Sequence, residues 1–372
     1  MSDIQIPNHL LPTDGRFGCG PSRVRQAQLA AFASEGAKLM GTSHRQAPVK
    51  NLVKRVQEGL MGLYHNPAGY EIVLGDGGST AFWDLASFSL ADGKAQALVH
   101  GEFGAKFVSA LKAPWLQTPT VIQAEPGSRL ELVAEAGVTT YVYPQNETST
   151  GVVAPVKRVA GADSDAIFLT DATSAAGGID FDPLQTDCYY FAPQKNFASD
   201  GGLWFALMSP AAVERAERIA ASDRYIPEFL SLKTAIDNSR LNQTLNTPAI
   251  ATLFLLAEQV DWINANGGLA WADARTKAAS AHLYDWAAER SFVTPFVANP
   301  EHRSQVVVTL DFEAGIDAAQ IAKVLRANGV VDTEPYRKLG RNQLRIATFT
   351  AVDQADIKAL TACIDYVVEQ LG

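Results

Sequence analysis

A lysine at the end of a short apolar run is the residue in this sequence best placed for covalent chemistry. The run Cys188-Tyr-Tyr-Phe-Ala, followed by Pro193, predicts an interior strand that ends just before Lys195. Burial costs an ammonium group more than a neutral amine, so we expect a lowered pKa for Lys195. Such an amine can attack a carbonyl carbon and form a Schiff base. The alternative is a structural lysine whose ammonium group extends into solvent.

Two further side chains follow predicted strands. Asp171 closes the apolar run 166–170, and it lies 24 residues before Lys195. A carboxylate there could keep the ring nitrogen of pyridoxal phosphate (PLP) protonated, so that the ring withdraws electrons from a substrate. Phe103 follows another strand and could stack on that ring. The alternatives are a turn or helix cap for Asp171 and core packing for Phe103.

A glycine-rich turn, Gly75-Asp-Gly-Gly-Ser-Thr, joins a predicted strand to a predicted helix. Free backbone N–H groups at a helix N-terminus, together with the hydroxyl groups of Ser79 and Thr80, suit a phosphate monoester. The turn matches neither GxxxxGK[ST] nor GxGxxG, the two common nucleotide-binding patterns. Most glycine-rich turns bind no anion, so this turn alone is a weak indication.

Composition narrows the class of protein. The chain has 372 residues, 47% of them hydrophobic, and can bury a large core. Its formal net charge of -9 argues against nucleic acid or an anionic membrane as the main partner. Three scattered cysteines predict no disulfide framework and a reducing cytoplasm, and no histidine or cysteine spacing predicts a metal site.

The N-terminal residues and the apolar segments predict neither export nor membrane insertion. The first fifteen residues carry charged and polar side chains and two prolines, where a secretion signal would need an apolar core. The apolar run 250–257 is far shorter than the roughly 20 residues that span a bilayer. We therefore expect 250–257 to belong to a core helix.

The order of the predicted elements indicates an α/β protein. Strands and helices alternate at short spacing, which predicts a largely parallel sheet with ligands at the carboxyl ends of its strands. Pro21 is expected to open the first helix. The expected strands are 70–74, 97–100, 120–123, 139–143, 166–170, 188–192 and 202–208, and the expected helices are 21–40, 49–64, 81–90, 104–111 and 210–221.

A second, smaller unit is predicted after a long helical section. Asn246-Thr-Pro is expected to cap and open a helix through Asn264, and Gly267-Gly to break it before a helix at 269–290. We place an N-terminal arm at 1–15, a large domain at 16–262 and a small α+β domain at 263–372. The small domain has expected strands at 305–310 and 343–347 and expected helices at 317–328 and 353–369.

Six short motifs, in this order, resemble the phosphoserine aminotransferase family, and the resemblance covers nearly the whole chain. They are Gly41-Thr-Ser-His-Arg, Asn146-Glu-Thr, Thr170-Asp-Ala-Thr-Ser, Ala192-Pro-Gln-Lys-Asn, Ser199-Asp-Gly-Gly and Asn246-Thr-Pro. Each is short, but their order is highly specific. The resemblance implies the type I fold of PLP-dependent transferases, which is aspartate-aminotransferase-like, and PLP as the cofactor.

The same resemblance implies roles for individual residues. Lys195 would form the Schiff base and Asp171 would pair with the ring nitrogen. Further cofactor contacts within the subunit would come from Ser79, Thr80, Phe103, Thr148 and Gln194. Asn246 and Thr247 would reach the cofactor phosphate from a second subunit, which implies a homodimer.

The implied substrate contacts are basic. Arg345 would bind the α-carboxylate, because a guanidinium places two N–H donors opposite two carboxylate oxygens. His44 and Arg45 would hold the second anionic group, a side-chain carboxylate or a phosphate. Many family members carry a Gly-His-Arg loop before the C-terminal arginine, whereas this chain has Tyr336-Arg-Lys-Leu-Gly-Arg-Asn. We rank Arg337 and Lys338 first as the phosphate contacts there, ahead of Arg341.

The resemblance implies a cytoplasmic enzyme of serine biosynthesis that converts glutamate and 3-phosphohydroxypyruvate to 2-oxoglutarate and O-phosphoserine. It also implies a related four-carbon phosphorylated substrate, 4-phosphohydroxy-L-threonine, in pyridoxine biosynthesis. Two kinds of alternative remain open: another PLP enzyme of this fold, such as an alanine–glyoxylate transaminase or a cysteine desulfurase, and a PLP-binding protein without turnover. A desulfurase needs a mobile cysteine. The expected positions of Cys19, Cys188 and Cys363 in a turn, a strand and a terminal helix disfavour that alternative.

Overall fold

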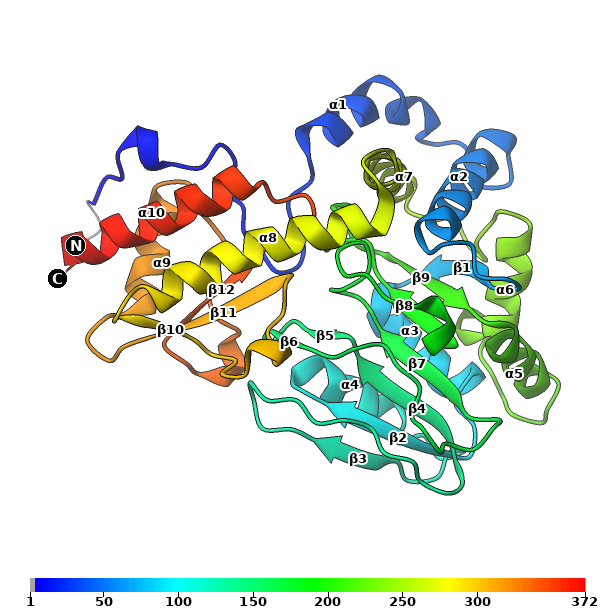
Figure 1. The fold of residues 1–372 in the computed structure, drawn as a ribbon. Helices are drawn as coiled ribbons and strands as arrows, with labels where there is room; N and C mark the ends of the chain where they lie inside the picture. The colour runs from blue at the N-terminus through cyan, green and yellow to red at the C-terminus, as the bar shows by residue number, and fades with distance from the viewer. Residues whose placement is uncertain (1–3, 372) are drawn as a thin grey trace.

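The large sheet has seven strands, and it is mostly parallel (Figure 1). The computed structural model describes residues 4–371. The strand order is β1-β9-β8-β7-β4-β2-β3, and only β9 runs antiparallel to its neighbours. This confirms the predicted α/β class. The strands are β1 (Glu71–Asp76), β2 (Lys94–Val99), β3 (Thr120–Gln123), β4 (Val138–Pro144), β7 (Ile167–Asp171), β8 (Cys188–Phe191) and β9 (Leu203–Met208).

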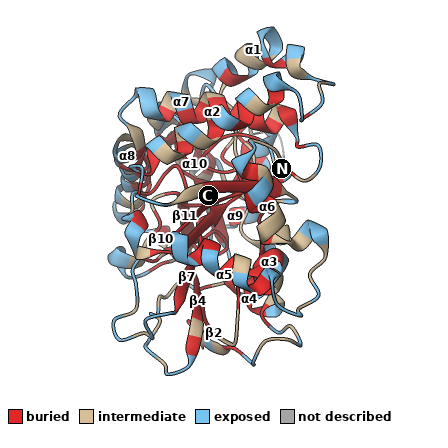
Figure 2. Cartoon of the chain, turned by 90° about the vertical axis from the view of Figure 1, so that its right-hand side faces the viewer, coloured by how far each residue is buried: buried red, intermediate tan, exposed pale blue. Residues whose placement is uncertain are grey.

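Helices cover both faces of this sheet because its central strands are apolar on both sides. Along β8, Tyr189 and Phe191 pack into one core with α2 and α7, whereas Cys188 and Tyr190 pack into a second core with α3 and α4. Figure 2 shows the strands as buried and the outer faces of the helices as exposed. The helices are α1 (Gln26–Ser34), α2 (Ala47–Leu63), α3 (Gly78–Ser89), α4 (Glu102–Ala110), α5 (Pro210–Ala220), α6 (Leu232–Arg240) and α7 (Ile250–Ala265).

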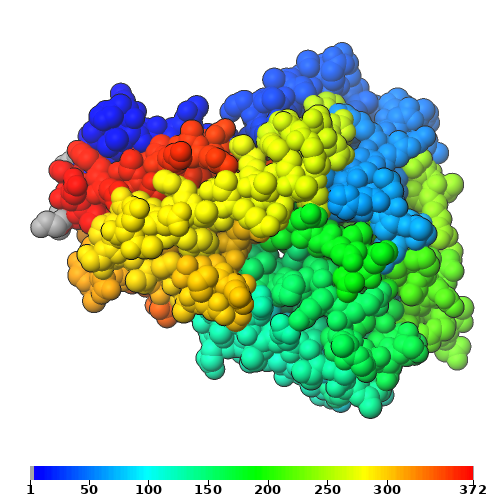
Figure 3. Space-filling view, viewed as in Figure 1, coloured from blue at the N-terminus to red at the C-terminus, as the bar shows by residue number. Residues whose placement is uncertain are grey.

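A second sheet, of three antiparallel strands, lies beside the large one with three helices around it (Figure 1). Its strands are β10 (Val293–Pro295), β11 (Val307–Phe312) and β12 (Gln343–Ala347), and its helices are α8 (Gly268–Ala288), α9 (Ala318–Ala327) and α10 (Gln354–Leu371). The space-filling view shows the blue N-terminal residues against the red C-terminal helix at this end of the molecule (Figure 3). The N-terminal segment and the C-terminal segment therefore pack together.

Short elements complete the fold. A two-stranded hairpin, β5 (Asn146–Glu147) and β6 (Val152–Val153), follows β4. The 3-10 helices are η1 (Asn8–Leu10), η2 (Gly36–Leu39), η3 (Pro183–Gln185), η4 (Glu228–Leu230), η5 (Pro300–His302) and η6 (Arg337–Leu339). The hairpin and strand β10 were missing from the sequence prediction, because runs of two or three residues carry too little periodicity.

The expected helix start at Pro21 is wrong. Helix α1 begins at Gln26, with Arg25 as its extended N-cap residue, and residues 22–25 have no regular secondary structure. The cause is tertiary: the Ser22 N–H donates to the Gln194 carbonyl at 2.7 Å, and the Ser22 hydroxyl donates to the Lys195 carbonyl at 2.7 Å. These bonds attach the segment to the lysine loop, so tertiary contacts outweigh the local preference of Pro21 for a helix start.

The expected N-cap at Asn246 is also wrong. Helix α7 begins at Ile250, and its N-cap position is Ala249. The Asn246 side chain accepts the backbone N–H of Thr247 at 2.8 Å, which closes a local turn in place of a helix cap. Asn246 and Thr247 are both exposed, so their side chains are available on the surface.

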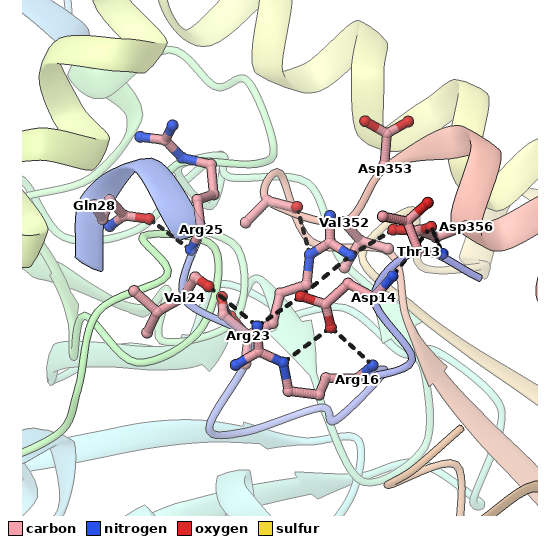
Figure 4. A network of polar contacts seen from close by, with 12 residues as sticks. Thr13, Asp14, Arg16, Arg23, Val24, Arg25, Gln28, Val352, Asp353 and Asp356 are labelled. Atoms are coloured by element: carbon pink, nitrogen blue, oxygen red, sulfur yellow. Dashed lines mark hydrogen bonds and ion pairs between the residues drawn. The ribbon is translucent and has the colours of Figure 1, made fainter. Parts of the chain in front are cut away.

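A partly buried polar network fixes the segment between residues 13 and 25 (Figure 4). The Arg23 guanidinium donates to the Asp356 carboxylate of α10 at 2.6 Å and to the Ala351 carbonyl at 2.8 Å. Asp356 also accepts the Thr13 N–H at 2.8 Å. Since Ser22 bonds to the lysine loop, this segment connects α10 to the residues around Lys195.

Residues 4–371 were expected to contain neither a membrane span nor a metal site. None of the described helices has the length and apolarity needed to cross a membrane. Within the same residues, no group of three or more His, Cys, Asp or Glu side chains comes together as a metal-binding set.

Candidate active site

A cavity of about 390 Å³ lies at the carboxyl ends of the parallel strands, and Lys195 lies in its wall. Because β9 alone is reversed, the ends of β1, β4, β7 and β8 meet at this edge of the sheet. Eight of the predicted site residues line the cavity: Ser79, Thr80, Phe103, Thr148, Asp171, Gln194, Lys195 and Arg345. Residues from distant parts of the sequence thus share one enclosed space.

Lys195 is nearly enclosed, with 7% of its surface exposed. Its Nζ donates to the Thr148 hydroxyl at 2.7 Å and lies 5.0 Å from the centre of the Phe103 ring. Burial lowers the pKa of Lys195 to about 8, although the nearby carboxylates of Asp171 and Glu147 act in the opposite direction. The amine therefore has an appreciable neutral, nucleophilic fraction near neutral pH.

Asp171 is held by three donors on the floor of the cavity. Its Oδ2 accepts the Tyr190 hydroxyl at 2.9 Å and the Trp83 indole N–H at 3.3 Å. Its Oδ1 accepts the Thr173 backbone N–H at 2.9 Å. These contacts fix the direction of the carboxylate. The sequence interpretation missed all three partners, although the pairing of β7 with β8, which sets Asp171 opposite Tyr190, would have revealed one of them.

The N-terminus of α3 forms another wall. Gly77 has φ +103° and Gly78 has φ +68°, values that favour glycine, and this backbone starts the helix at the edge of the cavity. The Ser79 hydroxyl lies 2.6 Å from the Thr173 hydroxyl. Helix N–H groups and hydroxyl groups together are suitable donors for a phosphate. Gln194 lines the same cavity, and its Oε1 is buried without a donor among the described residues.

The small sheet contributes Arg345, on β12, to the cavity. Its Nη1 donates to the Thr148 carbonyl at 3.1 Å, and its guanidinium lies 5.4 Å from the centre of the Tyr336 ring. Its buried Nε has no acceptor within the described part of the chain. The group is therefore oriented by the protein and still has hydrogen-bonding capacity for a carboxylate.

Four predicted residues do not reach the Lys195 cavity of their own chain. His44, Arg45, Asn246 and Thr247 lie outside it, and the Thr247 hydroxyl is 3.3 Å from His44 Nδ1. Burial lowers the pKa of His44, with a smaller contribution in the same direction from Arg45. The structure thus brings segments 44–45 and 246–247 together, which the sequence alone did not predict.

The basic residues of segment 337–341 do not line the Lys195 cavity either. Arg337 and Lys338 belong to the exposed helix η6, and Lys338 pairs with Glu102 at the start of α4. Arg341 pairs with Asp311. Tyr336, just before this group, lines the cavity, and its ring centre lies 6.0 Å from that of Phe103. Tyr336 was not among the predicted site residues.

Cys19, which the sequence interpretation placed in an N-terminal turn, is a further cavity residue. It is 5% exposed, and burial raises the pKa of its thiol. Cys188 and Cys363 lie in β8 and α10 as predicted. Cys19 belongs to the segment fixed by Arg23 and Ser22, which is the opposite of a mobile catalytic cysteine.

The side-chain and backbone groups that line the cavity fit PLP in three ways. A buried amine of lowered pKa can meet its aldehyde, a fixed carboxylate can meet its ring nitrogen, and a helix N-terminus with hydroxyl groups can meet its phosphate. The buried, unpaired Oε1 of Gln194 adds an acceptor for a polar group of the cofactor. The cavity thus offers a group for each reactive part of PLP.

Comparison with known proteins identifies relatives over the whole chain. The family model described as "Aminotransferase class-V" matches residues 21–333. A phosphoserine aminotransferase from a Nocardioides species is 61% identical over 374 residues, covering 100% of both chains.

Solved structures share the fold. A phosphoserine aminotransferase from Cytophaga hutchinsonii superposes with a TM-score of 0.86 at 20% identity, covering 97% of this chain and 100% of the other. A PLP-bound phosphoserine aminotransferase from Trichomonas vaginalis gives a TM-score of 0.81 at 19% identity, with 95% of this chain and 99% of the other covered. The comparisons therefore agree on fold over nearly the whole chain.

Proposed function

Because the chain belongs to the class-V aminotransferases, and among them to the phosphoserine aminotransferase family, we propose that it transfers an amino group between L-glutamate and 3-phosphohydroxypyruvate. The products are 2-oxoglutarate and O-phospho-L-serine. The cofactor is PLP. The observation that carries the proposal is one cavity that combines the buried amine of Lys195, the carboxylate of Asp171 and the guanidinium of Arg345.

Lys195 and Asp171 divide the proton chemistry between them. When bound, PLP supplies an aldehyde that takes up the amino group and a ring that withdraws electrons from the substrate Cα. The neutral amine of Lys195 would take the proton from Cα and pass it to the former aldehyde carbon of the cofactor, and the keto-acid half-reaction would run these transfers in reverse. Asp171 holds a proton at the ring nitrogen, and Tyr190 and Trp83 hold Asp171 in place.

Arg345 binds the α-carboxylate, and other basic residues bind the second anionic group. The Thr148 carbonyl and the Tyr336 ring orient the guanidinium of Arg345 before substrate arrives. For the side-chain carboxylate of glutamate or the phosphate of the keto acid, we propose His44, Arg45, Arg337 and Lys338. In its present contact, Lys338 pairs with Glu102, so binding a phosphate would require exchange of that partner.

We also propose a homodimer in which each active site is completed by its partner. His44, Arg45, Asn246 and Thr247 lie outside their own Lys195 cavity, and all but His44, which is 9% exposed, are exposed, as expected for residues that serve another copy. In a two-fold dimer such a group on each protomer can reach the cavity of the other. The phosphate of PLP and the second anion of the substrate would then be bound across the interface.

Shared sites predict complementation between two inactive variants. A Lys195→Ala protomer keeps Arg45, and an Arg45→Ala protomer keeps Lys195, so a mixed dimer has one complete site. Unfolding and refolding an equal mixture should restore about a quarter of the wild-type activity, measured as O-phosphoserine formation. Each variant refolded alone is the control. Activity no higher than in these controls would contradict the shared site.

The substrate assignment predicts a ranking of half-reactions. Glutamate and O-phosphoserine should each bleach the visible absorption band of the PLP-loaded protein, whereas alanine should do so poorly, because alanine lacks a second anionic group. Stopped-flow absorbance measures each rate. The reverse ranking would favour an alanine–glyoxylate transaminase, and a stable band with every amino acid would favour a binding protein without turnover. A purified protein that is colourless and stays colourless after incubation with PLP would refute PLP as the cofactor.

Two wider aspects of function follow the same proposal. We propose 4-phosphohydroxy-L-threonine as a second substrate, since it combines an α-amino acid with a phosphate as O-phosphoserine does, and the half-reaction assay applies to it directly. We further propose that the enzyme acts in the cytoplasm. All three cysteines are buried free thiols, which is typical of proteins in reducing compartments.

A further inference from the structure

Glu147 is a fully buried carboxylate immediately behind the cavity, and the proposed chemistry assigns it no role. Its side chain has 0% exposure, although a lone buried charge is costly. Four donors compensate this cost. Its Oε2 accepts the backbone N–H groups of Phe103 at 3.2 Å and Gly104 at 3.1 Å, and its Oε1 accepts the backbone N–H of Ser149 at 3.1 Å and its hydroxyl at 2.7 Å.

These bonds join two segments that are distant in sequence. One is the first turn of α4, which carries the Phe103 ring 5.0 Å from Lys195 Nζ. The other is the turn after β5, which carries Thr148, the hydroxyl partner of Lys195 at 2.7 Å. Ser149 strengthens the junction, because its hydroxyl oxygen also accepts the Glu102 N–H at 3.1 Å. Without Glu147, two side-chain bonds would still join these regions in the described structure: Ser149 Oγ would accept the Glu102 N–H, and the Thr150 hydroxyl would donate to the His100 carbonyl, just before α4, at 3.1 Å.

The charge of Glu147 matches its position. The first N–H groups of α4 have no partners within the helix, and the positive end of the helix dipole favours an anion there. Gly101, which precedes the helix, leaves no space beside it: a Cβ there would lie 2.4 Å from Ser149 Oγ and 2.7 Å from Glu147 Cγ. The junction is thus closely packed, and a small displacement of the carboxylate would move the start of α4.

We propose that Glu147 is a positioning residue, which sets the Phe103 ring against the bound cofactor and Thr148 against Lys195. The inference rests on the proposed function, since it concerns the same cavity. Glu147 does not line the cavity, so it positions cavity groups through these two neighbours, in addition to the effect of its charge on Lys195. Its role is to fix the separation between the stacking ring and the reactive amine.

A double-mutant cycle tests this role. Glu147→Gln keeps the shape of the side chain but removes its negative charge. It also places an NH₂ group opposite backbone N–H groups that need an acceptor. We expect it to raise the apparent dissociation constant for PLP about tenfold, with an altered circular dichroism of the cofactor band. In a Phe103→Leu background the same change should raise the constant by less than about threefold, because residues that act as a unit are not additive.

Asp187→Asn is the matched control. Asp187 is a buried carboxylate, 2% exposed, that accepts the Phe168 N–H at 2.9 Å and the Ser209 hydroxyl at 2.8 Å at the far end of β8. Removal of its charge should lower the melting temperature of the protein and leave the PLP affinity and the circular dichroism of the cofactor band unchanged. Glu147→Gln behaving in the same way would overturn the proposal.

Further outcomes are distinguishable. If Glu147→Gln does not fold, Ser149→Ala decides: it should weaken PLP binding about threefold with the same change of dichroism, and wild-type values would overturn the inference. An equal effect of Glu147→Gln on PLP affinity in the wild-type and the Phe103→Leu backgrounds would also overturn the inference. Failure of the wild-type protein to bind PLP would instead refute the proposed function.

Discussion

Replacement of Lys195 by alanine is expected to abolish covalent attachment of PLP and to lower kcat at least about 10³-fold. The reason is that one amine has two tasks, to join the cofactor and to move the Cα proton. Its burial and its single hydroxyl partner, Thr148, prepare it for both. The measurements are the visible absorption band, which should disappear, and the rate of phosphoserine formation.

Borohydride treatment followed by peptide mapping supplies the direct test. It should fix the cofactor to the peptide that contains Lys195 in the wild-type protein and to no peptide in the variant. Lys157→Ala is a suitable control, because Lys157 is an exposed lysine paired with Glu131 at 2.7 Å. A cofactor label on another lysine of the wild-type protein would contradict the assignment.

Replacement of Asp171 by asparagine is expected to lower kcat by about 10²–10³-fold, the usual effect of removing one preorganised electrostatic group. Asparagine retains an oxygen for Tyr190 and Trp83 but no charge that would hold a proton at the ring nitrogen. Steady-state kinetics and the absorption maximum of bound PLP report the two effects separately.

The control for Asp171 is again a buried carboxylate away from the site. Asp187→Asn should leave kcat within about twofold of wild type, since surface and structural substitutions act mainly on stability. Full activity of Asp171→Asn would show that the ring nitrogen does not depend on this carboxylate.

Much of the large sheet could be predicted because its strands are short apolar runs that end in polar residues. That rule singled out Lys195 and Asp171 as candidates, and the family resemblance supplied their roles: Asp171 is the last residue of β7 and Lys195 follows β8, two strands that are buried on both faces. Parallel strands bring such ends to one edge, so the position of the cavity followed from the fold class.

The missed contacts depend on information that a local pattern does not contain. Tyr190 and Trp83 reach Asp171 through strand register and helix packing, and Tyr336 arrives from the other sheet. The starts of α1 and α7 were misplaced because loop contacts replaced the expected caps. The domain limits at residues 15 and 262 and the roles of individual site residues stay predictions.

The network around Arg23 has a consequence for biosynthesis of the protein. Residues 13–25 touch the lysine loop, yet they are anchored by Asp356, and the cavity also needs Arg345. On the ribosome these two residues emerge long after the large sheet has been synthesised. A chain that stops short of residue 345 therefore lacks both the guanidinium proposed for the substrate carboxylate and the carboxylate that anchors residues 13–25.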